Sequence, residues 1–346
     1  MPVTPPLLVG WVADRALGDP RRGHPVAGFG RLAGRLEALL WRDGRAAGAA
    51  YVTVLVGGPA AAVWLLQRRL AARPLTLLLA LVTWAALGSR SLGREATAVA
   101  DAVARGDLDL ARRHLPALCG RDPAGLDGAE LCRAATESVA ENTADAVVGP
   151  LLWGALAGPA GVVAHRCANT LDALVGHRSP RYERFGWAAA RLDDLANWAP
   201  ARATALLAAA CAPLVGGSPG RALAVLRRDG GSHPSPNAGR CEAAFAGALG
   251  VRLGGANRYS ARVEVRGPLG DGPPPTPADL RRAIRLSTAV GAAVALAAAG
   301  APGAWRGRTG APVGAVGAPG AWRGRTGAPV GAAGALGASS ARRERR

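Results

Sequence analysis

The feature that most restricts the fold of this chain is a set of five apolar stretches without Asp, Glu or Arg in their interiors. Each has about 16–22 residues, and a helix needs about 20 residues to cross the hydrocarbon core of a bilayer. A charge at the centre of a membrane costs roughly 2.5–3.5 kcal/mol on insertion scales. The pattern predicts an all-α, polytopic integral membrane protein with polar connecting helices and loops between segments 46–67, 74–89, 146–165, 203–220 and 286–305.

Helix-breaking residues interrupt the third and fourth stretches. The third contains Pro150, Gly158 and Pro159, and the fourth contains Pro213 and Gly217. Pro and Gly are tolerated in membrane helices, but they also mark broken or re-entrant segments. A soluble protein with buried Ala-rich helices is the alternative, since the mean hydropathy is only +0.13.

The chain is strongly basic. It has 42 basic residues, all of them Arg, against 24 acidic residues, which gives a net charge of +18. The Arg residues flank the apolar runs, where cations anchor the ends of membrane helices. Nucleic-acid binding requires a basic face with groups that read or stack on bases, so we expect membrane lipid and anionic substrates as partners and no nucleic acid.

The C-terminal part of the chain contains an identical repeat. The 16 residues GAPGAWRGRTGAPVGA begin at Gly300 and again at Gly317. Two copies rich in Gly, Pro and Arg cannot bury a core. We therefore expect a membrane-embedded catalytic domain over 1–306 and a disordered tail over 307–346.

Three carboxylates mark the first polar motif. Glu137, Glu141 and Asp145 are spaced by four residues and share one helix face. Arg133, one turn earlier, can relieve the repulsion at Glu137 but cannot reach Asp145. A cation among the carboxylates explains the pattern, most simply Mg²⁺ with a phosphate substrate, and a solvated acidic face is the alternative.

A second and a third motif lie on either side of residue 180. His165, Asn169 and Asp172 share one helix face just after an apolar stretch, where polar groups are expensive and usually functional; helix capping is the alternative. Asp193 and Asp194 point about 100° apart on a helix. One of them can bind a metal or substrate while the other pairs with Arg191 or Arg202, and plain surface ion pairing is the alternative.

A fourth motif is the loop His233-Pro-Ser235-Pro-Asn237-Ala-Gly239. Its prolines hold the chain extended, which makes a rigid mount for polar side chains, although a simple connector is the alternative. The following Gly254-Gly255-Ala-Asn257-Arg258 would allow a backbone to approach a phosphate closely, but this is a weak signal alone.

Together these motifs resemble the adenosylcobinamide-phosphate synthase (CobD/CbiB) family of cobalamin biosynthesis. The resemblance runs in order from about residue 7 to about residue 300, and the repeated tail has no counterpart in it. It is carried by LGDPRRGHPV from Leu17, ESVAENTADAVVGPLLWGAL from Glu137, NTLDALVGHRSPRYERFGWAAARLDD from Asn169, HPSPNAG from His233, EAAFAGALGVRLGGANRY from Glu242 and PTPADLRRAI from Pro275.

The resemblance implies a multi-pass ligase of the cell membrane. Its expected reaction amidates the propionate carboxylate of a corrinoid, adenosylcobyric acid, with (R)-1-aminopropan-2-yl phosphate. It implies ATP as co-substrate, Mg²⁺ as cofactor, and a complex with other enzymes of the cobalamin pathway. The chain has no Walker A sequence, so an ATP site here is not a P-loop.

This chemistry gives each motif a hypothetical role. The side chains expected to hold Mg²⁺ are Glu137, Glu141, Asp145, Asp193 and Asp194, with Glu137 and Glu141 also counted as catalytic. The phosphate-binding candidates are Arg181, Arg191 and Arg258. The base for the incoming ammonium is His233, with His165 second, and the remaining substrate-binding candidates are Asn142, Asn169, Asp172, Ser235, Asn237 and Asn257.

The topology leaves two arrangements open. If the third and fourth stretches both cross the membrane, the second and third motifs lie opposite the first and fourth. Either those stretches are re-entrant, or the motif faces line one cavity at membrane depth. Two other functions also remain, a non-enzymatic AmpE-like membrane sensor and a corrinoid-binding or transport protein; the intact NTLD and HPSPNAG motifs favour the enzyme over the sensor.

Overall fold

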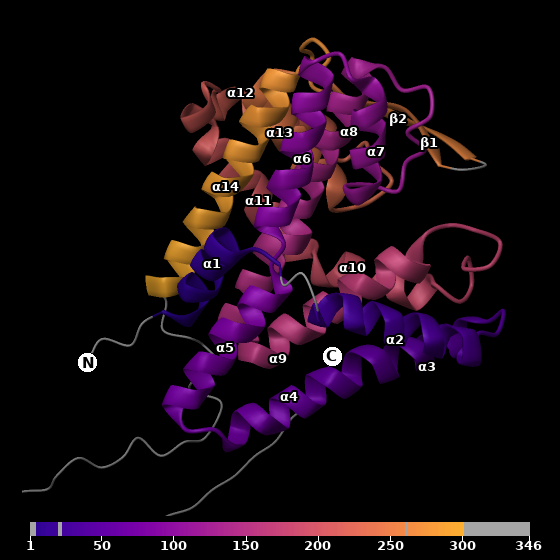
Figure 1. Cartoon of the computed structure of the whole chain (residues 1–346), viewed down its shortest axis with the longest axis vertical. Helices are drawn as coiled ribbons and strands as arrows, with labels where there is room; N and C mark the ends of the chain where they lie inside the picture. The colour runs from indigo at the N-terminus through magenta and orange to yellow at the C-terminus, as the bar shows by residue number, and fades with distance from the viewer. Residues whose placement is uncertain (1–4, 20–22, 260–261, 301–346) are drawn as a thin grey trace, which may run out of the picture. The chain divides into compact units, whose positions relative to one another are not determined.

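The computed structural model describes residues 5–19, 23–259 and 262–300. Helices make up most of this part of the chain, which also contains a β-hairpin near its C-terminal end (Figure 1). The predicted all-α class is confirmed. The predicted tail and its second repeat lie outside the described residues. All five cysteines are free.

The chain forms a succession of short and long helices, with two strands before the last helix. They are α1 (Pro6–Leu17), α2 (Pro25–Leu40), α3 (Arg45–Val52), η1 (Thr53–Gly57), α4 (Gly58–Arg69), α5 (Ala72–Ala86), α6 (Ser89–Ala104), α7 (Leu108–His114), η2 (Leu115–Ala117), α8 (Gly128–Thr143), η3 (Ala144–Val148), α9 (Gly149–Leu171), η4 (Asp172–Gly176), α10 (Trp187–Ala196), α11 (Trp198–Cys211), η5 (Ala212–Val215), α12 (Pro219–Asp229), α13 (Ala238–Leu249), β1 (Leu253–Tyr259), β2 (Arg262–Leu269) and α14 (Pro277–Gly300).

Five helical segments of the described residues are long and apolar enough to cross a membrane, and they coincide with the five predicted stretches. Large apolar side chains on them face outward, as Leu77 does at 71% exposure, which suits contact with lipid. The chain is therefore a multi-pass membrane protein. The segments are Arg45–Arg69, Ala72–Ala104, Gly128–Gly176, Trp198–Val215 and Pro277–Ala299.

The third of these segments is a helical hairpin rather than one straight span. Gly158 interrupts α9 with φ +69° and ψ −155°. A Cβ added at Gly161 would overlap the carbonyl oxygen of Trp153, and one added at Gly149 would overlap the ring of His165. In a straight helix residues 149 and 165 would lie about 24 Å apart. The chain therefore reverses at Gly158, which supports the re-entrant alternative for this stretch.

Helix α13 lies at the centre of the largest core cluster and is built mainly from small residues. Gly247 lets α12 approach closely, because a Cβ there would lie 2.7 Å from the Cα of Ala222. Small residues allow membrane helices to pack backbone against backbone. This packing fixes α13 and the loop that precedes it.

The hairpin of β1 and β2 was not predicted. The two strands are antiparallel, with Leu253 opposite Leu269 and an irregularity between Leu253 and Gly255. Gly254 has φ +83°, and a Cβ there would overlap the carbonyl oxygen of Gly267. Gly254 therefore allows the two strands to approach each other closely, and this backbone is not an open site for a phosphate.

Helix α14 begins at a capped N-terminus. The amide of Asp279 donates to Thr276 Oγ1 over 3.3 Å, and the Thr276 amide donates to Asp279 Oδ2 over 3.0 Å. Pro277 occupies the first helical position, where its missing N–H costs nothing.

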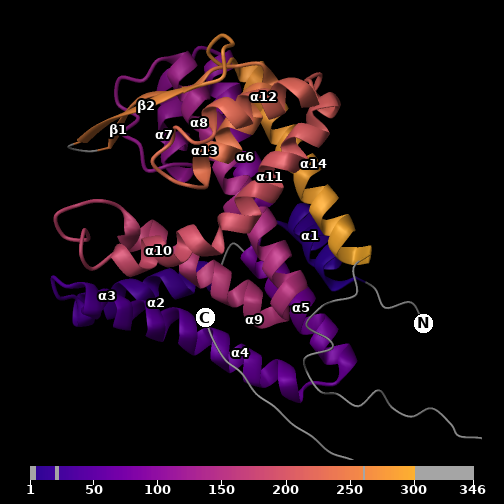
Figure 2. The ribbon, with the colours of Figure 1, turned by 180° about the vertical axis from the view of Figure 1, so that it is seen from behind.

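The helices gather in two groups in both views (Figures 1 and 2). Helices α2, α3, α4 and α10 lie together at one end, and α6, α7, α8, α12, α13 and the hairpin lie at the other. The long path from α8 through η3 into α9 connects the two groups. The first polar motif lies on this path, and the second lies at its end.

Candidate active site

A cavity of about 170 Å³ brings together side chains from all four polar motifs. Glu141, Asp145, Asp172 and Asp193 supply carboxylates that belong to the first three motifs. The fourth motif contributes Ser235 and Asn237. The full lining is Glu141, Ala144, Asp145, Asp172, Ala190, Asp193, Asp194, Asn197, Ala201, Ser235, Asn237, Ala238 and Cys241. We call this the carboxylate cavity.

The reversal at Gly158 explains why the first two motifs meet. Asp145 lies in η3 on the arm that leads into the hairpin, and Asp172 begins η4 on the arm that leads out. Gly158 is 13 residues after Asp145 and 14 residues before Asp172. An antiparallel hairpin with that apex places the two carboxylates at the same level.

Amide side chains hold Asp193 in the cavity wall. Its Oδ1 accepts from Asn197 Nδ2 over 3.0 Å and from Asn169 Nδ2 over 3.4 Å. Burial raises the pKa of Asp193 to about 6, while these two amide hydrogen bonds oppose the rise. Asn197 in turn accepts from Nε2 of His165 over 2.8 Å. His165 is buried and does not line the cavity, so it orients Asn197 instead of facing substrate.

Asp194 lies close to an arginine, unlike Asp193, which is held by amide side chains. Its carboxylate lies 3.8 Å from Nη1 of Arg191, as expected for one member of an adjacent pair. Partial burial raises the pKa of Asp194, and the charge of Arg191 opposes that rise. The backbone carbonyl of Asp194 accepts from Nδ2 of Asn237 over 2.8 Å, which ties the fourth motif to the third.

Glu137 lies outside the carboxylate cavity, although it shares a helix face with Glu141. It is paired with Arg121 and, over 3.3 Å, with Arg133, and it accepts from the amide of Gly254 over 2.7 Å. Arg133 also donates to Asn257 Oδ1 over 2.9 Å. Glu137 and Asn257, which we predicted to bind metal and substrate, therefore fasten α8 to the β-hairpin.

His233 also faces away from the cavity. Its Nδ1 accepts from the amide of Ser235 over 2.9 Å, and its Nε2 lies 3.8 Å from Oε1 of Glu242. Burial lowers the pKa of His233 to about 4 and raises that of Glu242 well above its usual range. Glu242 is fully buried and lies 3.8 Å from Arg266 Nη1 as well. Its one signal in the sequence is an acid inside the Ala-rich run of α13.

Two further candidates, Asn142 and Arg181, do not line the cavity. Asn142 donates to the carbonyl and hydroxyl oxygens of Ser138 within its own helix. Arg181 is 49% exposed and pairs with Glu37 over 2.6 Å. The side chain of Arg258 lies outside the described residues. Ser235 does line the cavity, but its hydroxyl also accepts from the amides of Asn237 and Ala238.

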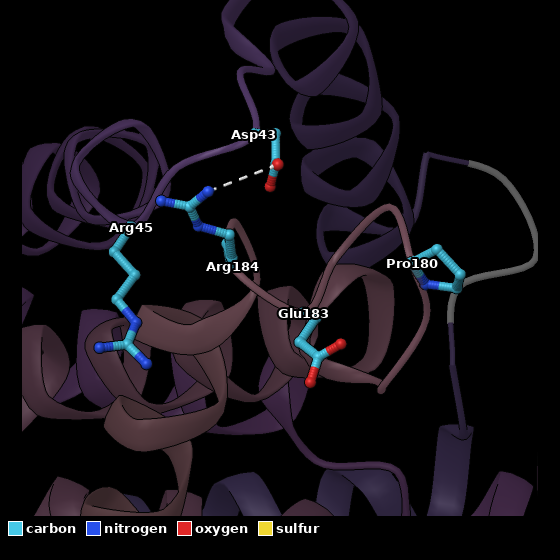
Figure 3. A pocket seen from close by; sticks show the side chains of 5 residues that line it. All are labelled: Asp43, Arg45, Pro180, Glu183 and Arg184. Carbon is cyan, nitrogen blue, oxygen red and sulfur yellow. Dashed lines mark ion pairs between the residues drawn. The ribbon is translucent and has the colours of Figure 1, made fainter.

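A wider depression of about 660 Å³ lies elsewhere, between the start of α3 and the loop before α10 (Figure 3). Asp43, Arg45, Pro180, Glu183 and Arg184 line it, and Arg184 pairs with Asp43 over 3.6 Å. Both partners are more than half exposed. It shares no residue with the carboxylate cavity, and ordinary surface charges form its walls.

The carboxylate cavity suits a magnesium ion that arrives with a phosphate. Among the described residues no three His, Cys, Asp or Glu side chains are already arranged to hold a metal ion. Mg²⁺, however, usually takes one or two carboxylates plus substrate phosphates and water. Glu141, Asp145 and Asp193 offer such oxygen donors, and no Arg in the described part of the chain forms an ion pair with them.

Comparison with known proteins agrees with the resemblance. The family model described as CobD/Cbib protein matches residues 7–287. A protein named cobalamin biosynthesis protein CobD from Mycobacterium tuberculosis is 56% identical over 292 residues, which cover 84% of this chain and 93% of the relative.

More distant relatives carry the same name. The protein from Pelobacter propionicus is 44% identical over 272 residues, covering 77% of this chain and 84% of its own length. The protein from Rhodobacter capsulatus is 44% identical over 283 residues, which cover 79% of this chain and 89% of the relative. No solved structure matches the chain. The chain therefore belongs to the CobD/CbiB family of cobalamin biosynthesis proteins.

Proposed function

We propose that this protein is an adenosylcobinamide-phosphate synthase of the cell membrane. It joins the propionate carboxylate of adenosylcobyric acid to the amine of (R)-1-aminopropan-2-yl phosphate with the consumption of ATP. The observation that carries the proposal is the carboxylate cavity, in which four motifs distant in sequence meet.

The size of the cavity suits the small partner in this reaction. Pockets that enclose drug-sized ligands occupy about 300–1,000 Å³, whereas this cavity has about 170 Å³. A metal-bound phosphate or the aminopropanol phosphate fits such a space. The corrinoid macrocycle remains outside, and only its propionate arm reaches the cavity.

The chain's own residues bind and orient the reactants. Glu141, Asp145 and Asp193 attract cations, which here are Mg²⁺ and the substrate ammonium. Asn169 and Asn197 fix the carboxylate of Asp193, so that little reorganisation accompanies binding. Bound Mg²⁺ would neutralise the phosphates of ATP. The propionate oxygen takes the γ-phosphoryl group of ATP and ADP leaves, which gives an acyl phosphate. The deprotonated amine then attacks its carbonyl carbon and inorganic phosphate leaves, which gives the amide.

The amine must lose its proton before it can attack. His233 does not line the cavity, and its Nδ1 already accepts a hydrogen bond. The nearest proton acceptors are the cavity carboxylates, among them Asp193 with its pKa of about 6. A carboxylate in this range accepts a proton more readily than an ordinary Asp.

Membranes that contain the protein provide the direct test. They would be incubated with adenosylcobyric acid, ATP, Mg²⁺ and aminopropanol phosphate, and the amide would be sought by mass spectrometry. We expect product with the complete mixture and none when ATP is omitted or Mg²⁺ is chelated. Corrinoid binding without product would instead identify a binding or transport protein.

A further inference from the structure

Two arginines beside the carboxylate cavity have no acidic partner. Arg202 lies in α11 and Arg240 in the first turn of α13. Within the described residues neither guanidinium makes an ion pair with Asp or Glu. Arg133 is paired with Glu137 and Arg191 with Asp194. Arg166 donates to Asn169 Oδ1 over 3.1 Å and lies close enough to Asp145 and Asp193 for their charges to interact, so the cavity carboxylates already offset its charge.

The two arginines meet at one contact between helices. Cys241 Sγ donates to the carbonyl of Ala201 over 3.6 Å, and both residues line the cavity. Arg202 and Arg240 are the neighbours of these two residues, and their charges repel each other. Arg202 Nη1 also donates to Asn237 Oδ1 in the cavity wall over 3.3 Å.

This arrangement is costly without an anion. The Nε of Arg240 is buried and has no hydrogen-bond partner, and a buried donor without a partner costs about 1–3 kcal/mol. The Arg202 guanidinium lies 4.0 Å from the centre of the Trp198 ring, which holds it in place. A guanidinium group presents paired donors that match the oxygens of a phosphate, and two such groups are available here.

We propose that Arg202 and Arg240 bind the phosphate group of a substrate at the edge of the carboxylate cavity. The inference rests on the proposed function, which supplies two such substrates, aminopropanol phosphate and ATP. Aminopropanol phosphate fits best, because it carries an ammonium for the carboxylates of Asp193 and Asp145 and a phosphate for the arginines. The pair replaces Arg181, which the structure places elsewhere.

Titration calorimetry on the purified full chain in nanodiscs tests the site. Aminopropanol phosphate and a non-hydrolysable ATP analogue would be titrated separately into wild type, Arg202→Gln and Arg240→Gln. We expect at least a tenfold loss of aminopropanol phosphate affinity in each variant, since one charge-assisted hydrogen bond contributes roughly 1.5–3 kcal/mol. Affinity for free aminopropanol, which lacks the phosphate, should not change.

Matched variants separate binding from folding. Arg184→Gln removes an exposed arginine that pairs with Asp43 and should bind like wild type. Arg240→Lys keeps the charge and should recover part of the affinity. A variant that melts well below wild type would be replaced by its Lys counterpart.

The outcomes separate the sources of phosphate. A loss confined to the ATP analogue would also support the site and assign it to the nucleotide. Unchanged affinity for both ligands would overturn the proposal, as would an effect seen only when phosphatidylglycerol is added to phosphatidylcholine nanodiscs. If wild-type membranes form no amide, the proposed function fails, but these titrations still decide whether the phosphate site exists.

Discussion

The two ends of one acidic helix face have opposite surroundings. Glu137 and Glu141 are a single turn apart, and both lie in the same polar stripe of α8. Glu137 is enclosed by Arg121, Arg133 and the Gly254 amide. Glu141 lines the carboxylate cavity together with four aspartates. Arginines therefore offset the negative charge of Glu137, whereas the negative charge around Glu141 is available to bind a cationic ligand.

On the proposed function, this difference separates a structural role for Glu137 from a cation-binding role for Glu141. A buried carboxylate that is already paired gains little from a metal ion, because its partners must first be displaced. A carboxylate among other carboxylates gains most from a cation. The comparison therefore predicts distinct consequences for the same substitution at the two positions.

The largest effect is expected for Glu141→Gln. Loss of one ligand to the cation should lower the rate of amide formation at least about 100-fold, because metal-assisted charge stabilisation is worth several kcal/mol. Removal of a repelling charge should leave the melting temperature unchanged or raised. Product per folded protein would be measured by mass spectrometry, with the exposed Glu183→Gln as a matched control. Full activity in Glu141→Gln would remove this residue from the mechanism.

Glu137→Gln should act on stability instead. Removal of one partner from a buried ion pair costs about 3–5 kcal/mol, because Arg121 and Arg133 would keep buried charges without Glu137. Chemical unfolding in detergent would measure the loss. The double variant Glu137→Gln/Arg133→Gln should recover part of it. If Glu137→Gln were as stable as wild type but inactive, Glu137 would have a functional role and not the structural role that we assign to it.

The sequence alone predicts several residues that line the cavity, such as Glu141, Asp145 and Asp193, but not the arginines that neutralise Glu137. Spacing by four places Glu137, Glu141 and Asp145 on one face, and this is a local property of the helix. The partner of Glu137 at Arg121 lies across a loop, and the Gly254 amide comes from the unpredicted β-hairpin. Such neighbours depend on tertiary packing, which no pattern of spacing contains.

The apolar segments were predictable for a different reason. Exclusion of charge over about 20 residues follows from the bilayer itself, so it is visible without any knowledge of partners. The Gly158-Pro159 break was also visible, although the sequence could not tell a kink from a reversal. The phosphate ligands were chosen from motifs, and Arg181 is found paired with Glu37 outside the cavity lining. Arg202 and Arg240, which we propose instead, belong to no distinctive motif.

Gly158→Ala tests the hairpin that brings Asp145 beside Asp172. A side chain at φ +69° is strained, and such a residue costs about 1–3 kcal/mol. We expect lower thermal stability and lower activity per folded protein, since the two arms no longer align. Gly57→Ala is the matched control: Gly57 has φ −65° and open space around it, so Ala should stabilise it by about 0.5–1 kcal/mol.

The smallest effect is expected for His233. Its ring lies close to the buried Glu242, which also lies close to Arg266. The pKa of His233 is about 4 in the folded protein against about 6.5 in an unfolded chain. The unfolded state therefore binds the proton first as the pH falls, and this residue lowers stability between about pH 6.5 and pH 4.

His233→Gln should remove that contribution, which amounts to at most about 2 kcal/mol at pH 5. Melting temperatures of wild type and variant would be compared across this window. Above about pH 7.5 the histidine is neutral in both states, so a difference there reports lost packing and serves as the reference. Equal slopes below pH 6.5 would mean that His233 is charged in the folded protein, and would place an ion pair with Glu242 where we place a neutral ring.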